Sequence, residues 1–136
     1  MDANENIQIV KDFFGAVRGG DTSRLLAFIA EDIEWIIPGK NWPLAGTHCG
    51  HAGVTELIKT ESETIVMSSM ELQGFVAQGE RVVVLGVAEG KVVATSKAFR
   101  DNWVFAITVR NGKLASIREY VDTQALALAA KAGAPG

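Results

Sequence analysis

The sequence predicts an α+β fold, in which helices occupy the first half of the chain and an antiparallel sheet the second. Apolar residues recur at helical spacing near the N-terminus, whereas the chain after residue 70 consists of alternating runs rich in valine, isoleucine and aromatics. Asn111-Gly112 stands between two of these runs, and both residue types accept a positive φ, which predicts a tight hairpin. Helices followed by a meander of strands are typical of an α+β fold rather than of a parallel βαβ sheet.

Three helices and one strand are expected in the first half. Gly19-Gly20 ends the first helix, because glycine accepts the left-handed conformation found at helix C-termini. Asp21 or Thr22 can cap the second. The expected elements are a helix over 5–18, a short helix carrying residues 25–29, a strand over 33–37 and a third helix over 52–67, whose apolar side includes Ile65 and Val66.

Four strands are expected in the second half. Because side chains alternate along a strand, Asp101 shares one face with a row of large aromatic and aliphatic residues, and Glu119 shares a face with Ile117 and Val121. Both carboxyls are therefore expected on the face that covers the helices. The strands are expected over 70–78, 82–89, 92–109 and 114–121, separated by turns at 78–80, 89–91 and 111–112.

Composition places the chain among single-domain globular proteins. Its 136 residues are 48% apolar, carry a net charge of −3 and contain no Lys/Arg cluster, so neither nucleic acid nor an anionic membrane is an expected partner. No apolar run approaches the roughly 20 residues of a membrane span. The N-terminus does not resemble a signal peptide, and the single cysteine fits a reducing compartment, which together predict a cytoplasmic protein. One domain over 1–136 is expected, with a flexible tail over 126–136.

The inward carboxyls are the main candidates for chemistry. A carboxyl on an apolar face has a raised pKa, which suits general acid or base catalysis near neutral pH, so Glu119 is the first catalytic candidate. The alternative is a structural pair between Glu119 and Arg81. Asp101 is a second catalytic candidate. The alternative is that Asp101 lies at an edge or turn, where Lys97 or Arg100 neutralises its charge.

The segment between the first strand and the third helix concentrates two tryptophans, two histidines and the cysteine. His48 is a candidate proton shuttle, and the alternative is an exposed loop histidine. His48, Cys49 and His51 are too closely spaced for a closed zinc site, so no metal is expected. The residues expected to line a ligand cavity, or alternatively to fill the core, are Trp35, Ile37, Trp42, Trp103, Phe105 and Val121. Arg81 is also a candidate ligand-binding residue, and the alternative is that it flanks the hairpin turn at Gly79.

Four short motifs follow one another along residues 5–125. They are Gly19-Gly20-Asp21 between two helices, the strand before Pro38, Leu44-Ala45-Gly46 with Gly50 opening a helix, and Gly112-Lys113-Leu114 followed by Arg118-Glu119-Tyr120-Val121-Asp122. Their order and spacing resemble the nuclear transport factor 2 (ketosteroid isomerase-like) superfamily, and within it the SnoaL-like group. The resemblance implies a cystatin-like α+β roll: a cone of curved antiparallel sheet around three helices, with an apolar cavity at one end and dimerisation through the outer sheet face.

The same resemblance separates this chain from two well-known activities of the fold. The three groups that ketosteroid isomerases use correspond here to Ile37, Phe13 and either Val104 or Phe105, none of which carries that chemistry. Limonene epoxide hydrolases use an Asp-Arg-Asp set for catalysis. Here Arg81 matches the arginine, Glu119 takes the place of one aspartate and Val83 replaces the other.

Two functions are consistent with these observations. The first is binding of a small apolar molecule and a cofactor-free proton transfer, of isomerase, dehydratase or cyclase type, with Glu119 as the acid or base and His48 or Asp101 assisting. The second is a non-catalytic ligand-binding or dimeric accessory protein of the same fold. Whether Glu119 faces an open cavity or is paired with Arg81 distinguishes the two.

Overall fold

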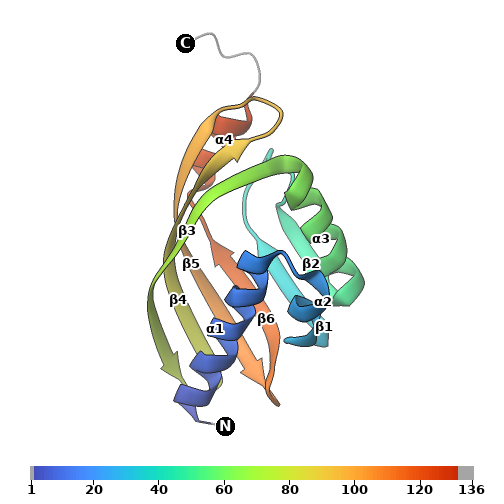
Figure 1. The fold of residues 1–136 in the computed structure, drawn as a ribbon, viewed down its shortest axis with the longest axis vertical. Coiled ribbons are helices and arrows are strands. Elements are labelled where there is room, and N and C mark those ends of the chain that lie inside the picture. Colours follow the sequence, from blue (N-terminus) through green and yellow to red (C-terminus); the bar gives the residue numbers. More distant parts are fainter. Residues whose placement is uncertain (1, 132–136) are drawn as a thin grey trace.

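Residues 2–131, which the computed structural model describes, form one six-stranded sheet and four helices. Figure 1 shows the long strands curving past the first helix, while the third helix runs beside the first two strands. The strand order is β2-β1-β6-β5-β4-β3. In chain order the elements are α1 (Ala3–Gly19), α2 (Thr22–Ala27), β1 (Ile29–Ile37), β2 (Gly46–Cys49), α3 (Gly50–Thr64), β3 (Ile65–Gln78), β4 (Arg81–Val92), β5 (Ala98–Arg110), β6 (Lys113–Tyr120) and α4 (Thr123–Ala130).

The predicted α+β class is confirmed, but the sheet is mixed rather than wholly antiparallel. β1 pairs with β6 in parallel, whereas β2 and the meander from β3 to β6 pair antiparallel with their neighbours. The last strand of the meander thus returns beside the first strand of the chain. No periodicity within either strand could reveal that pairing, because β1 and β6 are separated by most of the sequence.

The first helix extends one or two residues beyond its predicted ends, and the second ends at Ala27, so Phe28 and Ile29, which were expected in it, lie outside it. Asp2 accepts a hydrogen bond from the backbone N–H of Glu5 at the start of α1, and Gly20 adopts a left-handed φ of 66° at its end. Asp21 then caps α2 by accepting from the N–H of Arg24 at 3.0 Å. α1 is thereby fixed with its apolar side against β3 and β4.

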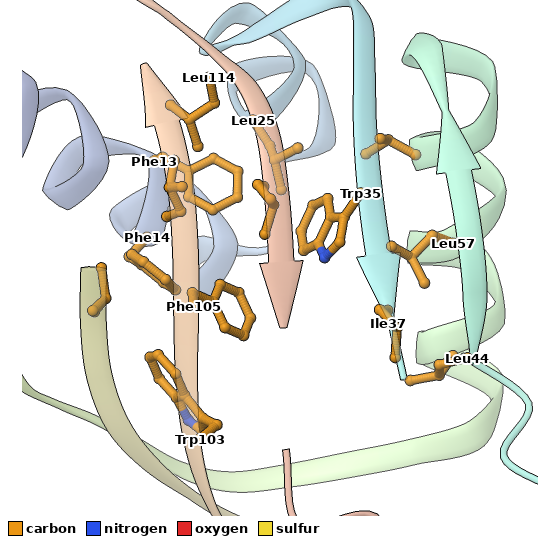
Figure 2. Packing of buried hydrophobic residues seen from close by; sticks show 14 of the residues in the cluster. Phe13, Phe14, Leu25, Trp35, Ile37, Leu44, Leu57, Trp103, Phe105 and Leu114 are labelled. Atoms are coloured by element: carbon orange, nitrogen blue, oxygen red, sulfur yellow. The ribbon is translucent and has the colours of Figure 1, made fainter. Parts of the chain in front are cut away.

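The predicted face of the long strand β5 is also confirmed. Alternate residues from Phe99 to Val109 are buried, and the hairpin that follows β5 has positive φ at both Asn111 and Gly112. The aromatic residues of this face meet those of α1 and β1 (Figure 2). Phe14 stacks on Trp103 with ring centroids 5.7 Å apart, and Phe105 lies 4.7 Å from Trp103.

Several predicted boundaries were wrong. Ile65 and Val66 belong to β3 rather than to the third helix, because α3 ends at Thr64 and the chain becomes extended there. β1 begins at Ile29, earlier than expected, and residues 46–49 form a strand where a loop was expected. In each case pairing with a neighbouring strand decides the conformation, and the local sequence does not reveal the partner.

The expected turn at 89–91 lies inside β4, where Gly90 pairs with Met67 and Phe99. The chain turns later, over 93–97, where Ser96 has a φ of 59°.

Part of the expected flexible tail forms α4, which Asp122 caps and which packs against β5. Residues 132–136 lie outside the described residues. No helix within 2–131 is long and apolar enough to cross a membrane.

Candidate functional site: an aromatic cavity with three carboxyls

The curved sheet and α1 enclose a cavity of about 350 Å³. Its walls are unusually aromatic, since seven of the ten aromatic residues of the chain line it. Figure 2 shows five of these side chains converging from α1, β1 and β5. The seven are Phe13, Phe14, Trp35, Trp42, Phe99, Trp103 and Phe105. Such a cavity can surround a small organic molecule with ring faces and edges.

Glu119 contributes a carboxyl group to this cavity from β6. The indole Nε1–H of Trp35 donates a hydrogen bond to Glu119 Oε2 at 2.6 Å. The two ion pairs formed within residues 2–131 both lie elsewhere, at Arg100–Glu89 and Arg110–Glu80, so Arg81 is not the partner of Glu119. Burial raises the pKa of Glu119 to about 8; the Trp35 hydrogen bond lowers it, and the nearby charges of Glu61 and Asp101 raise it further. At neutral pH the group is thus mostly protonated.

Asp101 lines the same cavity and is held from the backbone. Its side chain is 6% exposed, and its Oδ1 accepts a hydrogen bond from the N–H of Asp122 at 2.7 Å. Burial raises the pKa of Asp101, the hydrogen bond from Asp122 lowers it and the charge of Asp122 raises it. The cations suggested by the sequence are engaged elsewhere: Lys97 Nζ donates to the carbonyl of Lys131, and Arg100 pairs with Glu89.

Glu61 is a third carboxyl in the cavity lining, and it was not among the predicted site residues. It lies on α3, and burial raises its pKa. A signal was present in the sequence, because Glu61 follows Leu57 by four residues and so lies on the apolar side of the helix. Three acids from α3, β5 and β6 thus share one cavity.

The other predicted site residues divide into two groups. His48 lies on β2 with its Nε2 2.8 Å from the carbonyl oxygen of Leu44, and Arg81 is exposed at the start of β4; neither lines the cavity. Within residues 2–131, no group of three or more His, Cys, Asp or Glu side chains is placed to hold a metal ion. The predicted residues that do line the cavity, besides Glu119 and Asp101, are Trp35, Ile37, Trp42, Trp103, Phe105 and Val121.

Gly86 shapes the wall of the cavity by making room for Trp103. The two residues pair across β4 and β5, and a Cβ atom at position 86 would lie 2.6 Å from Cε2 of the indole. The absence of a side chain at position 86 lets the Trp103 ring pack against the backbone of the neighbouring strand, where Trp103 is 3% exposed. Trp103 Nε1 has no hydrogen-bond partner in the part of the chain that the structure describes.

The SnoaL-like domain family matches residues 10–117, which is most of the chain. The chain belongs to this family. Solved structures place it in the same superfamily: an NTF2-like protein from Burkholderia xenovorans is 59% identical, with a TM-score of 0.90 over 96% of this chain and 99% of that one. An NTF2-like protein of unknown function from Burkholderia pseudomallei is 27% identical, with a TM-score of 0.84 over 97% and 100%.

TerC, solved after co-crystallisation with polyporic acid, is also similar. It is 28% identical to this SnoaL-like domain, with a TM-score of 0.79 over 93% of this chain and 98% of that one. No match was found among the curated proteins. The resemblance drawn from the motif order is therefore confirmed at the level of family and fold.

Removing the Trp35 hydrogen bond is expected to raise the pKa of Glu119 above about 8, because that bond favours the charged form of the carboxyl. Trp35→Phe keeps an aromatic ring but removes the N–H donor. The pKa can be measured by carbon NMR of labelled glutamate side chains. Trp42→Phe is the matched control, since Trp42 also lines the cavity but makes no hydrogen bond to Glu119. A Trp35→Phe titration identical to that of the wild type would contradict the role given to this bond.

Proposed function

We propose that this SnoaL-like protein binds a small apolar molecule in its cavity and catalyses a cofactor-free proton transfer of isomerase, dehydratase or cyclase type, with Glu119 as the acid and base. One observation carries the proposal: the Glu119 carboxyl borders an aromatic cavity and is held by Trp35, with no neutralising ion pair to any residue of 2–131. A carboxyl that served only to stabilise the fold would be expected to have a cationic partner.

The arrangement suits both directions of proton transfer. With a pKa near 8, Glu119 carries a proton at neutral pH and can donate it to a basic atom of a bound molecule. The carboxylate that remains can then take a proton from a carbon of the same molecule, so that Glu119 is restored and no electrons are gained or lost. Trp35 stabilises the intermediate carboxylate, because its N–H remains bonded to Oε2. His48 has no part in this mechanism, because it lies outside the cavity lining.

The comparisons support a ligand of this kind. TerC was co-crystallised with polyporic acid, and TerC shares the fold and 28% of its sequence with this chain. The aromatic lining of the cavity gives a small organic molecule extensive apolar contact. Isomerase, dehydratase and cyclase reactions share the proton transfers that one carboxyl can perform.

The proposal includes a homodimer formed through the outer face of the sheet. Leu85, Val104 and Tyr120 occupy adjacent register positions on β4, β5 and β6. Leu85 and Tyr120 are 41% and 55% exposed. A second copy of the chain would cover this apolar row without closing the cavity, which lies on the opposite face of the sheet.

Hydrogen–deuterium exchange tests the catalytic part without knowledge of the natural substrate. A panel of small apolar ketones is incubated with the protein in D₂O, and exchange at the carbons next to the carbonyl is followed by NMR. We expect faster exchange with the wild type for at least one ketone, and a loss of roughly 100-fold or more in Glu119→Gln, which cannot accept the proton. Glu63→Gln is the control, since Glu63 lies on α3 and is exposed.

Two results would contradict catalysis by Glu119. Exchange that persists at the wild-type rate in Glu119→Gln would assign the chemistry to another group. Ketone binding in the cavity without any accelerated exchange would instead favour the non-catalytic binding protein, since the cavity would be occupied while the carboxyl remained inactive.

A further inference from the structure

The cavity has an excess of acidic groups that the proton-transfer proposal does not use. Glu61, Asp101 and Glu119 line it, and within residues 2–131 none of the three forms an ion pair. Among the described residues of the lining Arg18 is the one cation, but it is exposed and its guanidinium donates to the carbonyl of Met70 at 3.0 Å. A mechanism that needs one carboxyl leaves Glu61 and Asp101 unexplained.

Asp101 is the most informative of these groups. It is nearly fully buried, and its one hydrogen bond from a described residue reaches Oδ1, so Oδ2 lacks a protein donor within residues 2–131. The carboxyl group of Glu61 accepts no hydrogen bond from a described residue, and that of Glu119 accepts one, at Oε2. These carboxyl oxygens, in a cavity with largely aromatic walls, are therefore free to accept a hydrogen bond or to face a positive charge from a ligand.

The walls between these acids are of the type that binds organic cations. The faces of tryptophan and phenylalanine rings attract positive charge, and aromatic enclosures are a recurrent way to bind ammonium groups in proteins. All three tryptophans of the chain line this cavity. The three carboxyls are not grouped closely enough to form a metal site within residues 2–131, so a compact metal ion does not fit their spacing.

We infer that the ligand of the cavity carries a positive charge: an organic ammonium group on an apolar body, with the charge set among Glu61, Asp101 and Glu119 and the body against the aromatic walls. This inference rests on the proposed function and names the class of molecule that the same site takes. It also gives Glu61 and Asp101 a role, since they balance the charge of the ligand.

A bound cation would also change the state of Glu119. The charges of Glu61 and Asp101 raise the pKa of Glu119, and a positive charge among them lowers it. Binding would therefore release the proton from Glu119 and leave a carboxylate ready to act as a base at neutral pH. For such a ligand the two proton transfers run in the opposite order from that described for a neutral one: Glu119 first takes a proton from a carbon of the ligand and then returns it.

A pair of isosteric probes tests the inference. Benzyltrimethylammonium and neopentylbenzene have the same shape and differ in one atom, the charged nitrogen or the neutral carbon at the centre of the branched group. Because all three tryptophans line the cavity, binding of either probe can be followed by intrinsic tryptophan fluorescence at neutral pH. We expect the ammonium probe to bind about tenfold more tightly or better, although transfer out of water favours the neutral probe.

Three variants locate the origin of this preference. Asp101→Asn and Glu61→Gln are each expected to weaken binding of the ammonium probe severalfold and to leave neopentylbenzene unchanged, which also shows that the variants are folded. In Asp101→Asn the side-chain amide oxygen remains an acceptor for the N–H of Asp122, so the backbone contact is preserved. Glu63→Gln, on the exposed side of α3, is expected to change neither affinity.

The outcomes separate this inference from the proposal on which it rests. Equal or tighter binding of neopentylbenzene would overturn the cationic ligand and leave an apolar-ligand site standing. A preference for the ammonium probe that survives both Asp101→Asn and Glu61→Gln would overturn the role of these carboxyls. Failure of both probes to bind would overturn the inference together with the proposed small-molecule site.

Discussion

Glu119→Gln is expected to be more stable than the wild type in alkaline solution and equally stable in mildly acidic solution. Between pH 4.5, the ordinary pKa of glutamate, and about 8, its pKa in the folded protein, the folded state keeps a proton on Glu119 that the unfolded chain has released. Each rise in pH within this window therefore favours unfolding, and the effect is complete above about pH 8. Glutamine resembles the protonated carboxyl and can accept the Trp35 hydrogen bond at every pH.

The size of this effect follows from the pKa difference. At about 1.4 kcal/mol per pH unit, the contribution of Glu119 has an upper value of about 5 kcal/mol, which water entering the cavity reduces. Urea unfolding at about pH 5 and about pH 9 measures it directly. Asp101 and Glu61 also have raised pKa values, so the free energy of unfolding of Glu119→Gln still falls as the pH rises, but less steeply than that of the wild type.

Glu63→Gln provides the matched control for this measurement, because it makes the same chemical change at an exposed position of α3. Its stability is expected to follow the wild type at both pH values. If Glu119→Gln also followed the wild type in parallel, Glu119 would have an ordinary pKa in the folded protein, and its function as an acid at neutral pH would be lost with it.

Local signals in the sequence were sufficient for the elements that local interactions form. The end of α1 at Gly20, the cap of α2 at Asp21 and the hairpin at Asn111-Gly112 depend on residues adjacent in the chain, and all three were predicted. The parallel pairing of β1 with β6 and the extended conformation of Ile65 depend on strands far away in the sequence. Such long-range pairing overrides local propensity, which explains these errors.

In the candidate site, too, local signals predicted some features, whereas others depend on long-range strand pairing. Strand periodicity placed Glu119 and Asp101 on the inner face, because alternation is a property of a single strand. Strand periodicity could not predict the hydrogen bond from Trp35 to Glu119, because this bond joins β1 and β6 and the sequence did not indicate that these two strands pair. Glu61 was missed because one acid on the apolar side of a helix is notable only when the neighbouring strands are known to bring two more.

Gly90→Ala is expected to destabilise the protein by about 3 kcal/mol. A Cβ atom at this position would meet the backbone carbonyl oxygen of Val66 and would lie 3.0 Å from the Phe99 ring and 3.2 Å from Cα of Met67. Two of these three contacts are to backbone, which cannot move aside without displacing β3. The strand is already irregular there, since the pairing of β3 with β4 shifts between Met67 and Ser69.

Gly15→Ala is the control that separates this steric effect from the general cost of replacing glycine. Gly15 lies in α1, is exposed, and a Cβ atom there would meet nothing within 4 Å. Alanine at position 15 is expected to stabilise the protein by about 0.5–1 kcal/mol, because it favours the helix and restricts the unfolded chain. Thermal or urea unfolding of the two variants measures the difference. If Gly90→Ala were as stable as the wild type, β3 would not be held against β4 as closely as the structure requires, and the wall of the cavity formed by Met67 and Phe99 would be free to move.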